Sequence, residues 1–260
     1  MTYKNLLFEI KNHTALVTIN RPDKLNALNG QTIDELEDVF KSIKNNDEIF
    51  VVVITGSGEK AFVAGADIAE LNKLDVISAK EFSEKGNRIF REIETLGKPV
   101  IAALHGYALG AGLALSLLCD IRLAAENTKL GAGFPAMGLV PELGMTYTLP
   151  ELVGIGRALE LSLTANRFDA AEALRIGLIN KVLQEEKLLE EALAMARQMA
   201  QLPPLALKWT KKAIRCGAEG NLEDSFRLES HMNALCYSSE DHKEATSAFF
   251  EKRKPIFKGK

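Results

Sequence analysis

The sequence has few of the features that mark secreted or membrane proteins. Its three cysteines, Cys119, Cys216 and Cys236, are widely spaced without a C-x-x-C pair, which favours free thiols in a reducing compartment over a disulfide framework. No uninterrupted apolar run approaches the roughly 18 residues that span a bilayer. The first residues, MTYKNLLFEIK, have no basic segment followed by an apolar core. We therefore expect a cytoplasmic protein with no membrane partner.

An excess of charge of one sign is also lacking. The 32 basic and 35 acidic residues give a net charge of −3, so the composition favours no nucleic-acid partner. The four histidines, His13, His105, His231 and His242, show neither H-E-x-x-H nor cysteine-paired spacing, and we expect no metal site. Neither a G-x-x-x-x-G-K-[ST] phosphate loop nor a G-x-S-x-G serine elbow occurs.

One glycine-rich segment resembles a dinucleotide-binding fingerprint only superficially. Gly56 to Ala61 matches G-x-G-x-x-[GA] after a predicted strand. The following residues, Phe62 to Ile68, do not form the amphipathic helix that the fingerprint requires. We therefore expect no bound dinucleotide cofactor.

What the sequence does contain is an alternation of strand and helix patterns. Hydrophobic residues make up 47% of its 260 positions, enough for one large α/β core. Alternating and continuous apolar runs predict strands, and apolar residues spaced by three and four predict helices. The predicted elements are a hairpin of Leu6 to Ile10 and Ala15 to Asn20, a helix capped by Asn29 or Thr32, a strand at Ile49 to Thr55, a helix at roughly Ser78 to Leu96, and a strand at Val100 to Leu104. This order indicates the α/β class.

The pattern changes beyond Leu183, where helices follow one another without an intervening strand. The sequence therefore predicts two regions, an α/β core over residues 1–184 and a helical region over residues 185–260. The helices are predicted at Lys187 to Gln201, Pro204 to Cys216, Leu222 to Tyr237 and Glu240 to Glu251.

Two clusters of glycine and alanine stand where a ligand could approach the backbone. Gly106, Gly110 and Gly112 lie between the strand ending at Leu104 and a helix-like run. Ala64-Gly-Ala-Asp-Ile68 is the second cluster. Each can expose backbone N–H groups at the start of a helix. Close packing of turns is the alternative explanation, but together the clusters predict a two-donor oxyanion hole.

Five ordered stretches of the sequence resemble the crotonase (enoyl-CoA hydratase/isomerase) superfamily. The resemblance implies a β-β-α spiral core, a helical C-terminal region used for trimerisation, and a homotrimer or a hexamer made as a dimer of trimers. It also implies an acyl-CoA thioester substrate, with coenzyme A carried by the substrate and no separate cofactor. The stretches are Arg21 to Asn29, Lys60 to Ile68, Gly106 to Asp120, Gly138 to Gly144 and Phe249 to Phe257.

The resemblance also implies which residues form the site. It assigns the oxyanion-hole amides to Ala66 and Ala111, and alanine keeps the backbone N–H that this role needs. Residues that match the family's CoA-binding stretches are Lys24, Ala27, Ala64, Asp67, Ile68, Phe249 and Lys252. The last two match a C-terminal helix that can reach the CoA of a neighbouring subunit.

The sequence departs from the hydratase pattern at both catalytic carboxylates. Where hydratases of the family carry two glutamates, this chain has Ala114 and Phe134, and neither side chain can transfer protons. Glu142 instead matches the acidic position of some Δ3,Δ2-enoyl-CoA isomerases, in apolar surroundings formed by Phe134, Leu139 and Leu143. We therefore expect Glu142 to be catalytic, removing a proton from C2 and returning it at C4. A glutamate at the surface or at a helix start is the alternative explanation.

Two other functions remain open at this point. The chain could be a hydratase-like enzyme of fatty acid or aromatic acid degradation acting on an unusual substrate. It could also be a CoA-binding relative without turnover, since both familiar glutamates are missing.

Overall fold

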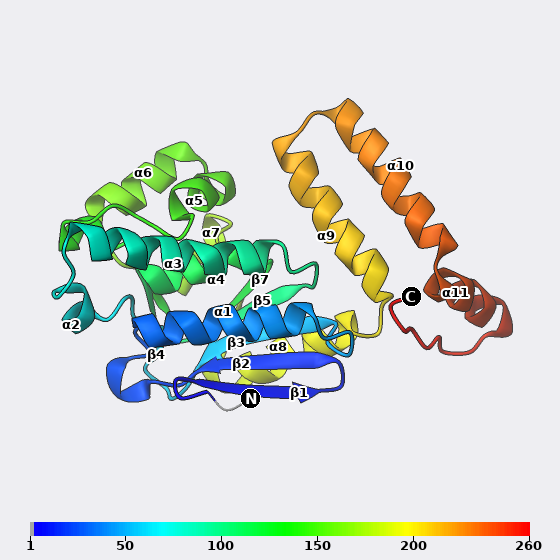
Figure 1. Cartoon of the computed structure of the whole chain (residues 1–260), viewed down its shortest axis with the longest axis horizontal. Coiled ribbons are helices and arrows are strands. Elements are labelled where there is room, and N and C mark those ends of the chain that lie inside the picture. The colour runs from blue at the N-terminus through cyan, green and yellow to red at the C-terminus, as the bar shows by residue number, and fades with distance from the viewer. Residues whose placement is uncertain (1–2) are drawn as a thin grey trace.

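The computed structural model describes residues 3–260, the side chain of Phe90 excepted. It begins with an antiparallel hairpin of β1 (Leu6–Lys11) and β2 (Thr14–Ile19) (Figure 1). Asn12 and His13 connect the strands with φ of 50° and 60°, the left-handed backbone that matches the twist of a two-residue hairpin turn. The predicted hairpin is confirmed.

The strands that follow alternate between two sheets. After β3 enters the large sheet, β4 enters the small one, and β5 with β6 and β7 with β8 repeat the step. The large sheet has the order β1-β2-β3-β5-β7-β10 and the small one β4-β6-β8-β9. The chain thus advances as a spiral of strand pairs and helices. The bounds are β3 (Val51–Gly56), β4 (Ala61–Val63), β5 (Val100–Leu104), β6 (Tyr107–Leu109), β7 (Ile121–Ala125), β8 (Lys129–Gly131), β9 (Phe168–Asp169) and β10 (Lys181–Leu183).

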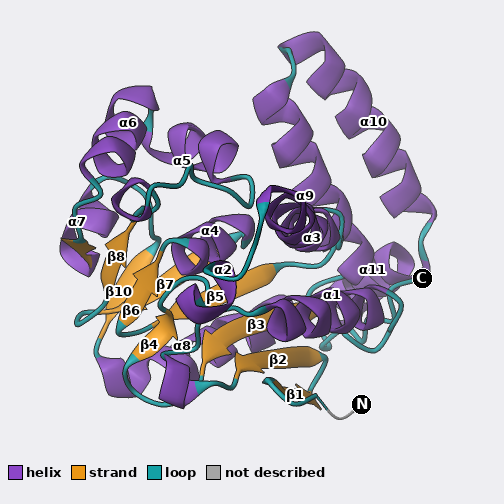
Figure 2. Cartoon of the chain, turned by 60° about the vertical axis from the view of Figure 1, so that its left-hand side comes forward, coloured by secondary structure: helices purple, strands orange, loops and turns teal. Residues whose placement is uncertain are grey.

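Helices cover both faces of the large sheet (Figure 2). On β3, Val52 and Ile54 point into the cluster formed with α1 (Gly30–Lys44) and α3 (Val76–Glu94). The alternate residues of the strand, such as Val53, pack with α8 (Glu185–Met199) on the opposite face. A strand buried on both faces carries a continuous apolar run, so the prediction for this segment is confirmed.

The two long helices on one face of the large sheet, α1 and α3, each start at a side-chain cap. Asn29 accepts a hydrogen bond from the Thr32 backbone N–H at 2.9 Å at the start of α1, which decides between the two predicted caps. Asp75 and Ser78 form a capping box before α3, so this helix starts slightly earlier than its apolar stripe predicts.

Shorter helices complete the core after each strand pair. They include α4, which is buried along its whole length. The structure adds three helices between Met145 and Arg175 that the sequence analysis did not predict. The bounds are α2 (Ile68–Leu71), α4 (Ala111–Leu118), α5 (Met145–Val153), α6 (Ile155–Thr164) and α7 (Ala170–Arg175), with 3₁₀ turns η1 (Pro22–Lys24) and η2 (Pro135–Met137).

The C-terminal helices divide into one that belongs to the core and three that leave it. Helix α8 buries Leu188, Ala192 and Ala196 against the large sheet, so the packed core ends with α8 rather than at the expected boundary between residues 184 and 185. The helices α9 (Pro204–Glu219), α10 (Leu222–Ser238) and α11 (Glu240–Glu251) form an arm that extends from the core (Figure 1). Within residues 3–260, no helix is long and apolar enough to cross a membrane.

Candidate active site

Two turns at the ends of neighbouring strands form the base of the site. Strands β4 and β6 are parallel neighbours, so their carboxyl ends lie at the same edge of the small sheet, where ligands commonly bind in α/β folds. The turns continue through Gly65 and Gly110, both with positive φ. A Cβ atom built on Gly110 would lie 3.9 Å from the Gly65 Cα. The two turns therefore pack backbone against backbone, as glycine permits.

The first predicted donor, the Ala66 N–H, is left free by the hydrogen bonds around it. Ala66 forms a parallel bridge with Leu28. The bridge uses the Leu28 N–H, which donates to Gly65 O at 2.8 Å, and the Asp67 N–H, which donates to Leu28 O at 2.8 Å. Among the contacts of residues 3–260, the Ala66 N–H itself has no acceptor. It remains available to a ligand.

The second predicted donor, the Ala111 N–H, lies at the uncapped start of α4. The N-cap residue Gly110 has no side chain to accept from the first turn, and first-turn N–H groups have no acceptor within their own helix. A Cβ atom on Gly112 would overlap the Val63 carbonyl oxygen, so this glycine lets the helix start against β4. The described contacts include no protein acceptor for the Ala111 N–H.

Glu142 lies in the loop between η2 and α5, where the backbone turns sharply. The next two residues, Leu143 and Gly144, have φ of 56° and 72°. A left-handed leucine costs about 1 kcal/mol, and here its side chain is buried, with 6% exposure. Glu142 is half-buried and directly precedes this buried, left-handed leucine.

The three residues come together around one small cavity. Ala66, Ala111 and Glu142 line a cavity of about 10 Å³, roughly the space of one water molecule. Among the described residues that line it, Glu142 alone has an ionisable side chain. Apolar residues and a glycine form the remaining walls, namely Leu28, Ile33, Phe82, Gly86, Ile89 and Leu143. The structure thus brings Glu142, Ala66 and Ala111 to one cavity that is otherwise apolar.

Gly86 is a cavity residue that the sequence analysis missed. It lies inside α3, where a glycine costs roughly 0.5 to 1 kcal/mol relative to alanine. A Cβ atom at this position would overlap the Leu143 Cδ2 methyl, so the missing side chain makes room for Leu143. The glycine within the apolar pattern of α3 was the available signal, since such a glycine often has a packing reason.

The expected surroundings of Glu142 are only partly correct. Leu143 lines the cavity, but Leu139 is 48% exposed and is not among the residues that line it. Phe134 is buried beside the Gly110 turn and is not among the residues that line the cavity. The other apolar walls come instead from Leu28, α1 and α3, which no local pattern around Glu142 could indicate.

Most of the predicted CoA-binding residues occupy two segments that are tied together. Ala64 N–H donates to Leu25 O at 3.0 Å, and this joins the loop that holds Lys24 and Ala27 to the turn that holds Ala64, Asp67 and Ile68. Arg21, which the sequence analysis did not select, forms an ion pair with Asp67 at 2.9 Å. The Arg21 hydrogen bond lowers the pKa of Asp67. The Asp67 carboxylate therefore holds the two segments together, and CoA contact by this residue stays a prediction.

The other two predicted CoA-binding residues lie elsewhere in the chain. Phe249 and Lys252 are at the end of α11, which lies at the opposite end of the molecule from α2 (Figure 1). One chain alone does not bring them to the site. The expectation that they reach the CoA of a neighbouring subunit stays a prediction.

Comparison with known proteins gives a consistent result over the whole chain. Residues 9–260 match the family model described as enoyl-CoA hydratase/isomerase. The chain is 43% identical to a short-chain-enoyl-CoA hydratase of Clostridium acetobutylicum over 98% of this chain and 97% of that protein. It is 42% identical to a crotonyl-CoA hydratase of Syntrophomonas wolfei over 99% of each. The crystal structure of an enoyl-CoA hydratase from Bacillus anthracis superimposes with a TM-score of 0.96 at 34% identity, covering 99% of this chain and 100% of that one.

The match includes both sheets, the turns at Ala66 and Ala111 and the helical C-terminal region, and it agrees with the α/β spiral observed here. The chain therefore belongs to the enoyl-CoA hydratase/isomerase family of acyl-CoA enzymes.

Proposed function

We propose that this protein is an enoyl-CoA isomerase that moves a double bond by transferring one proton. The thioester oxygen accepts hydrogen bonds from the N–H groups of Ala66 and Ala111. Glu142 removes a proton from C2 of a 3-enoyl thioester and returns it at C4, so that the double bond moves to C2. Coenzyme A enters and leaves with the acyl group, and no other cofactor takes part.

The observation that carries this proposal is the cavity in which, among the lining residues that the structure describes, Glu142 alone has an ionisable side chain. Proton abstraction next to a thioester leaves negative charge on the thioester oxygen, and two fixed N–H donors stabilise that charge without having to reorient. The isomerisation needs only one group that accepts and then donates a proton. One carboxylate beside two donors therefore suffices.

A hydratase-like reaction is the second candidate, because the two relatives with 43% and 42% identity are named as hydratases. Adding water to a double bond requires one group to activate the water and a proton delivered to carbon. Ala114 is fully buried and Phe134 is nearly so, and neither can transfer a proton. Under this candidate Glu142 would have to perform both steps.

The test separates the two reactions by substrate and product. Purified protein is incubated with 3-butenoyl-CoA and, separately, with crotonyl-CoA, and the products are resolved by chromatography. We expect conversion of 3-butenoyl-CoA to crotonyl-CoA and little 3-hydroxybutyryl-CoA. Hydration of crotonyl-CoA faster than isomerisation would reject the isomerase proposal in favour of the second candidate.

The role of Glu142 is tested with Glu142→Gln, which keeps the shape of the side chain. We expect its isomerase kcat to fall by about 10²- to 10⁴-fold, as is usual for loss of a general acid–base group. Glu126→Gln is the matched control, since Glu126 lies in an exposed turn, and it should keep the activity of the unmodified protein. Retention of full activity in Glu142→Gln would contradict the mechanism.

A further inference from the structure

One wall of the cavity that Glu142 lines includes a buried contact between two distant segments. The Leu143 side chain extends from the loop before α5 toward α3, where Gly86 has no side chain to obstruct it. Both residues are costly choices on local grounds: a leucine with φ of 56° and a glycine inside a helix. Nothing in the local backbone explains why the chain accepts this free-energy cost. We therefore look for the explanation in the contact between the two residues.

This contact packs Leu143 directly against the backbone of α3. The Leu143 Cδ2 methyl lies where it would overlap a Gly86 Cβ atom, so only a glycine at this position lets the leucine pack so closely. Phe82 and Ile89, from the same face of α3, flank the contact and are also part of the wall. The apolar space beside Ala66 and Ala111 therefore ends at Leu143.

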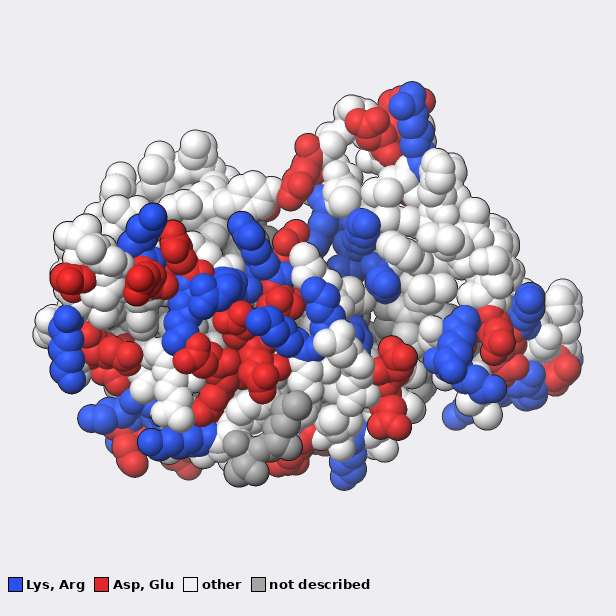
Figure 3. Space-filling view, viewed as in Figure 1, with Lys and Arg blue, Asp and Glu red and all other residues white. Residues whose placement is uncertain are grey.

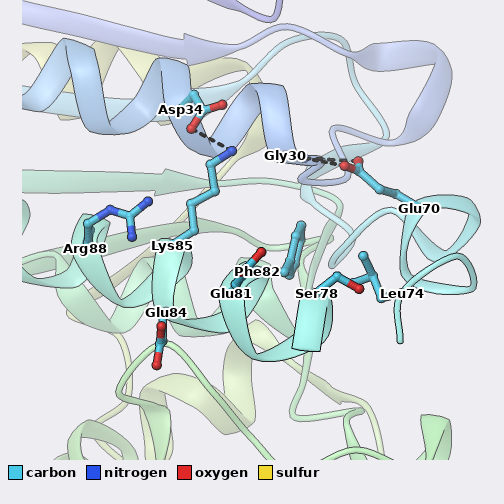
Figure 4. A pocket seen from close by; sticks show the side chains of 10 residues that line it. All are labelled: Gly30, Asp34, Glu70, Leu74, Ser78, Glu81, Phe82, Glu84, Lys85 and Arg88. Atoms are coloured by element: carbon cyan, nitrogen blue, oxygen red, sulfur yellow. Dashed lines mark hydrogen bonds and ion pairs between the residues drawn. The ribbon is translucent and has the colours of Figure 1, made fainter. Parts of the chain in front are cut away.

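Beyond Phe82 the surroundings change from apolar to charged. Phe82 also lines a second, open cavity of about 520 Å³ between α1, α2 and α3, shown in Figure 4. There Lys85 forms an ion pair with Asp34 at 2.6 Å, and Glu70 accepts from the Gly30 N–H at 3.0 Å. A long acyl chain that passed Phe82 would reach these ionic groups. Burying them against methylene groups would remove their hydration without replacing it.

We propose that Leu143, seated on Gly86, sets the length of acyl chain that this protein accepts, and that it selects acyl groups only a few carbons long. The proposal deepens the proposed function, because it names the substrate class of the same cavity. It concerns the binding of the acyl group, however, and not the proton transfer. It can therefore be tested even if the reaction is a different one.

The experiment measures how binding depends on chain length. Dissociation constants of butyryl-CoA and decanoyl-CoA are determined by isothermal titration calorimetry for the unmodified protein, Leu143→Ala and Leu143→Gly. The unmodified protein should bind butyryl-CoA more tightly than decanoyl-CoA. Either variant should shift the ratio of the two constants toward decanoyl-CoA by about tenfold or more, since single methylene differences in a pocket are worth factors of about 10 to 200.

Two further variants test the contact itself. Gly86→Ala places a methyl group against the end of the flexible Leu143 side chain and pushes it into the cavity, so binding of butyryl-CoA should weaken by about tenfold. Val140→Ala is the control, because Val140 is 76% exposed in the same loop, and it should leave both constants unchanged. Leu143→Gly also relieves the left-handed backbone, so it provides a folded variant if Leu143→Ala is unstable.

The proposal is overturned if folded Leu143→Ala and Leu143→Gly keep the chain-length ratio of the unmodified protein. It is also overturned if the unmodified protein binds decanoyl-CoA more tightly than butyryl-CoA. A failure of the isomerase assay combined with the expected shift in binding would reject the proposed reaction and leave the role of Leu143 standing. Isomerase activity without the shift in binding would support the proposed reaction and reject the role of Leu143.

Discussion

The α/β core and the C-terminal arm use their apolar residues in opposite ways. In the core, α4 is buried along its whole length, and the large sheet is covered on both faces. In the arm, no apolar residue of α9 is buried, and among the residues described in α10 only Met232 is. Figure 3 shows charged groups across the core at α1 and α3, whereas the face of α10 in this view is uncharged beyond the charged groups at its start.

This difference indicates that the core folds on its own contacts, whereas the arm lacks part of its packing in a single chain. The exposed apolar residues of the arm include Leu222, Phe226, Leu235, Tyr237, Phe249 and Phe250. Apolar surface of this extent on a helical arm is typical of a surface that another protein covers. We therefore expect the arm to bury these residues in a homotrimer or a hexamer.

A single substitution should lower the free energy of unfolding most at the joint between the core and the arm. Asp120 accepts from the Val100 N–H at 2.8 Å at the start of β5, and it forms ion pairs with Lys211 and Arg215 of α9, both at 2.7 Å. Burial lowers the pKa of Lys211, and Asp120 opposes that shift. The carboxylate thus links the core to the arm.

We predict that Asp120→Ala lowers the free energy of unfolding by about 3 to 5 kcal/mol, because it leaves the buried Lys211 charge without its partner. Urea denaturation measures the change. Glu126→Ala, at an exposed turn, should change the same quantity by no more than about 0.5 kcal/mol. Equal stabilities for the two variants would show that the joint does not depend on this carboxylate.

A second prediction concerns the packing of the core beneath the site. Gly112→Ala brings a methyl group against the Val63 carbonyl oxygen, and neither backbone can move easily. We expect a loss of about 2 to 3 kcal/mol and a displaced Ala111 N–H, detected by denaturation and by weaker acyl-CoA binding. The control is Gly156→Ala in α6, where nothing lies within 4 Å of the added atom. This helix should gain stability, so a loss in both variants would contradict the explanation.

The sequence alone predicted those parts of the fold that depend on local patterns. The hairpin, the strand at Val51–Gly56, α1 and the four C-terminal helices follow from alternation, helical spacing and capping residues. The strands of the small sheet were not predicted, since β4, β6 and β8 each have three residues. Three residues are too few to show a period.

The candidate site was predictable where glycine marks an unusual backbone and was not where two distant segments meet. Gly110 and Gly112 indicated a helix start with backbone N–H groups free of a side-chain cap, and the structure has one there. The left-handed conformation of Leu143 has no sequence signal, because leucine rarely adopts it. Its contact with Gly86 depends on how α3 packs against the loop before α5, which is a property of the whole fold.

The third prediction tests the arm. Replacing Leu222 and Phe226, one helical turn apart on α10, by aspartate should change the unfolding of the core by less than about 0.5 kcal/mol but should dissociate the assembly. Light scattering at micromolar concentration measures the mass. Val76→Asp is the control, since Val76 is an exposed apolar residue at the start of α3. A monomeric unmodified protein would contradict the expected oligomer.

The smallest predicted effect concerns an ion pair at the end of the arm. Glu244 binds Arg253 in a bidentate pair at 2.5 and 2.8 Å and accepts from the Ile256 N–H at 2.9 Å. These contacts, led by the Arg253 hydrogen bond, lower the pKa of Glu244 from 4.5 to about 2.

A carboxyl group whose pKa is lower in the folded state stabilises that state above its unfolded pKa, and the contribution is lost as the pH falls through the folded value. The Ile256 amide should therefore be held by Glu244 at pH 7 and released between pH 4.5 and about 2. Hydrogen exchange of the Ile256 amide measures this release.

In Glu244→Gln the Ile256 amide should exchange rapidly already at pH 7, whereas in Glu240→Gln, at the start of the same helix, it should not. Because the pair is exposed, its effect on global stability should be small, and equal protection of Ile256 in all three proteins would show that the tail is held by other contacts.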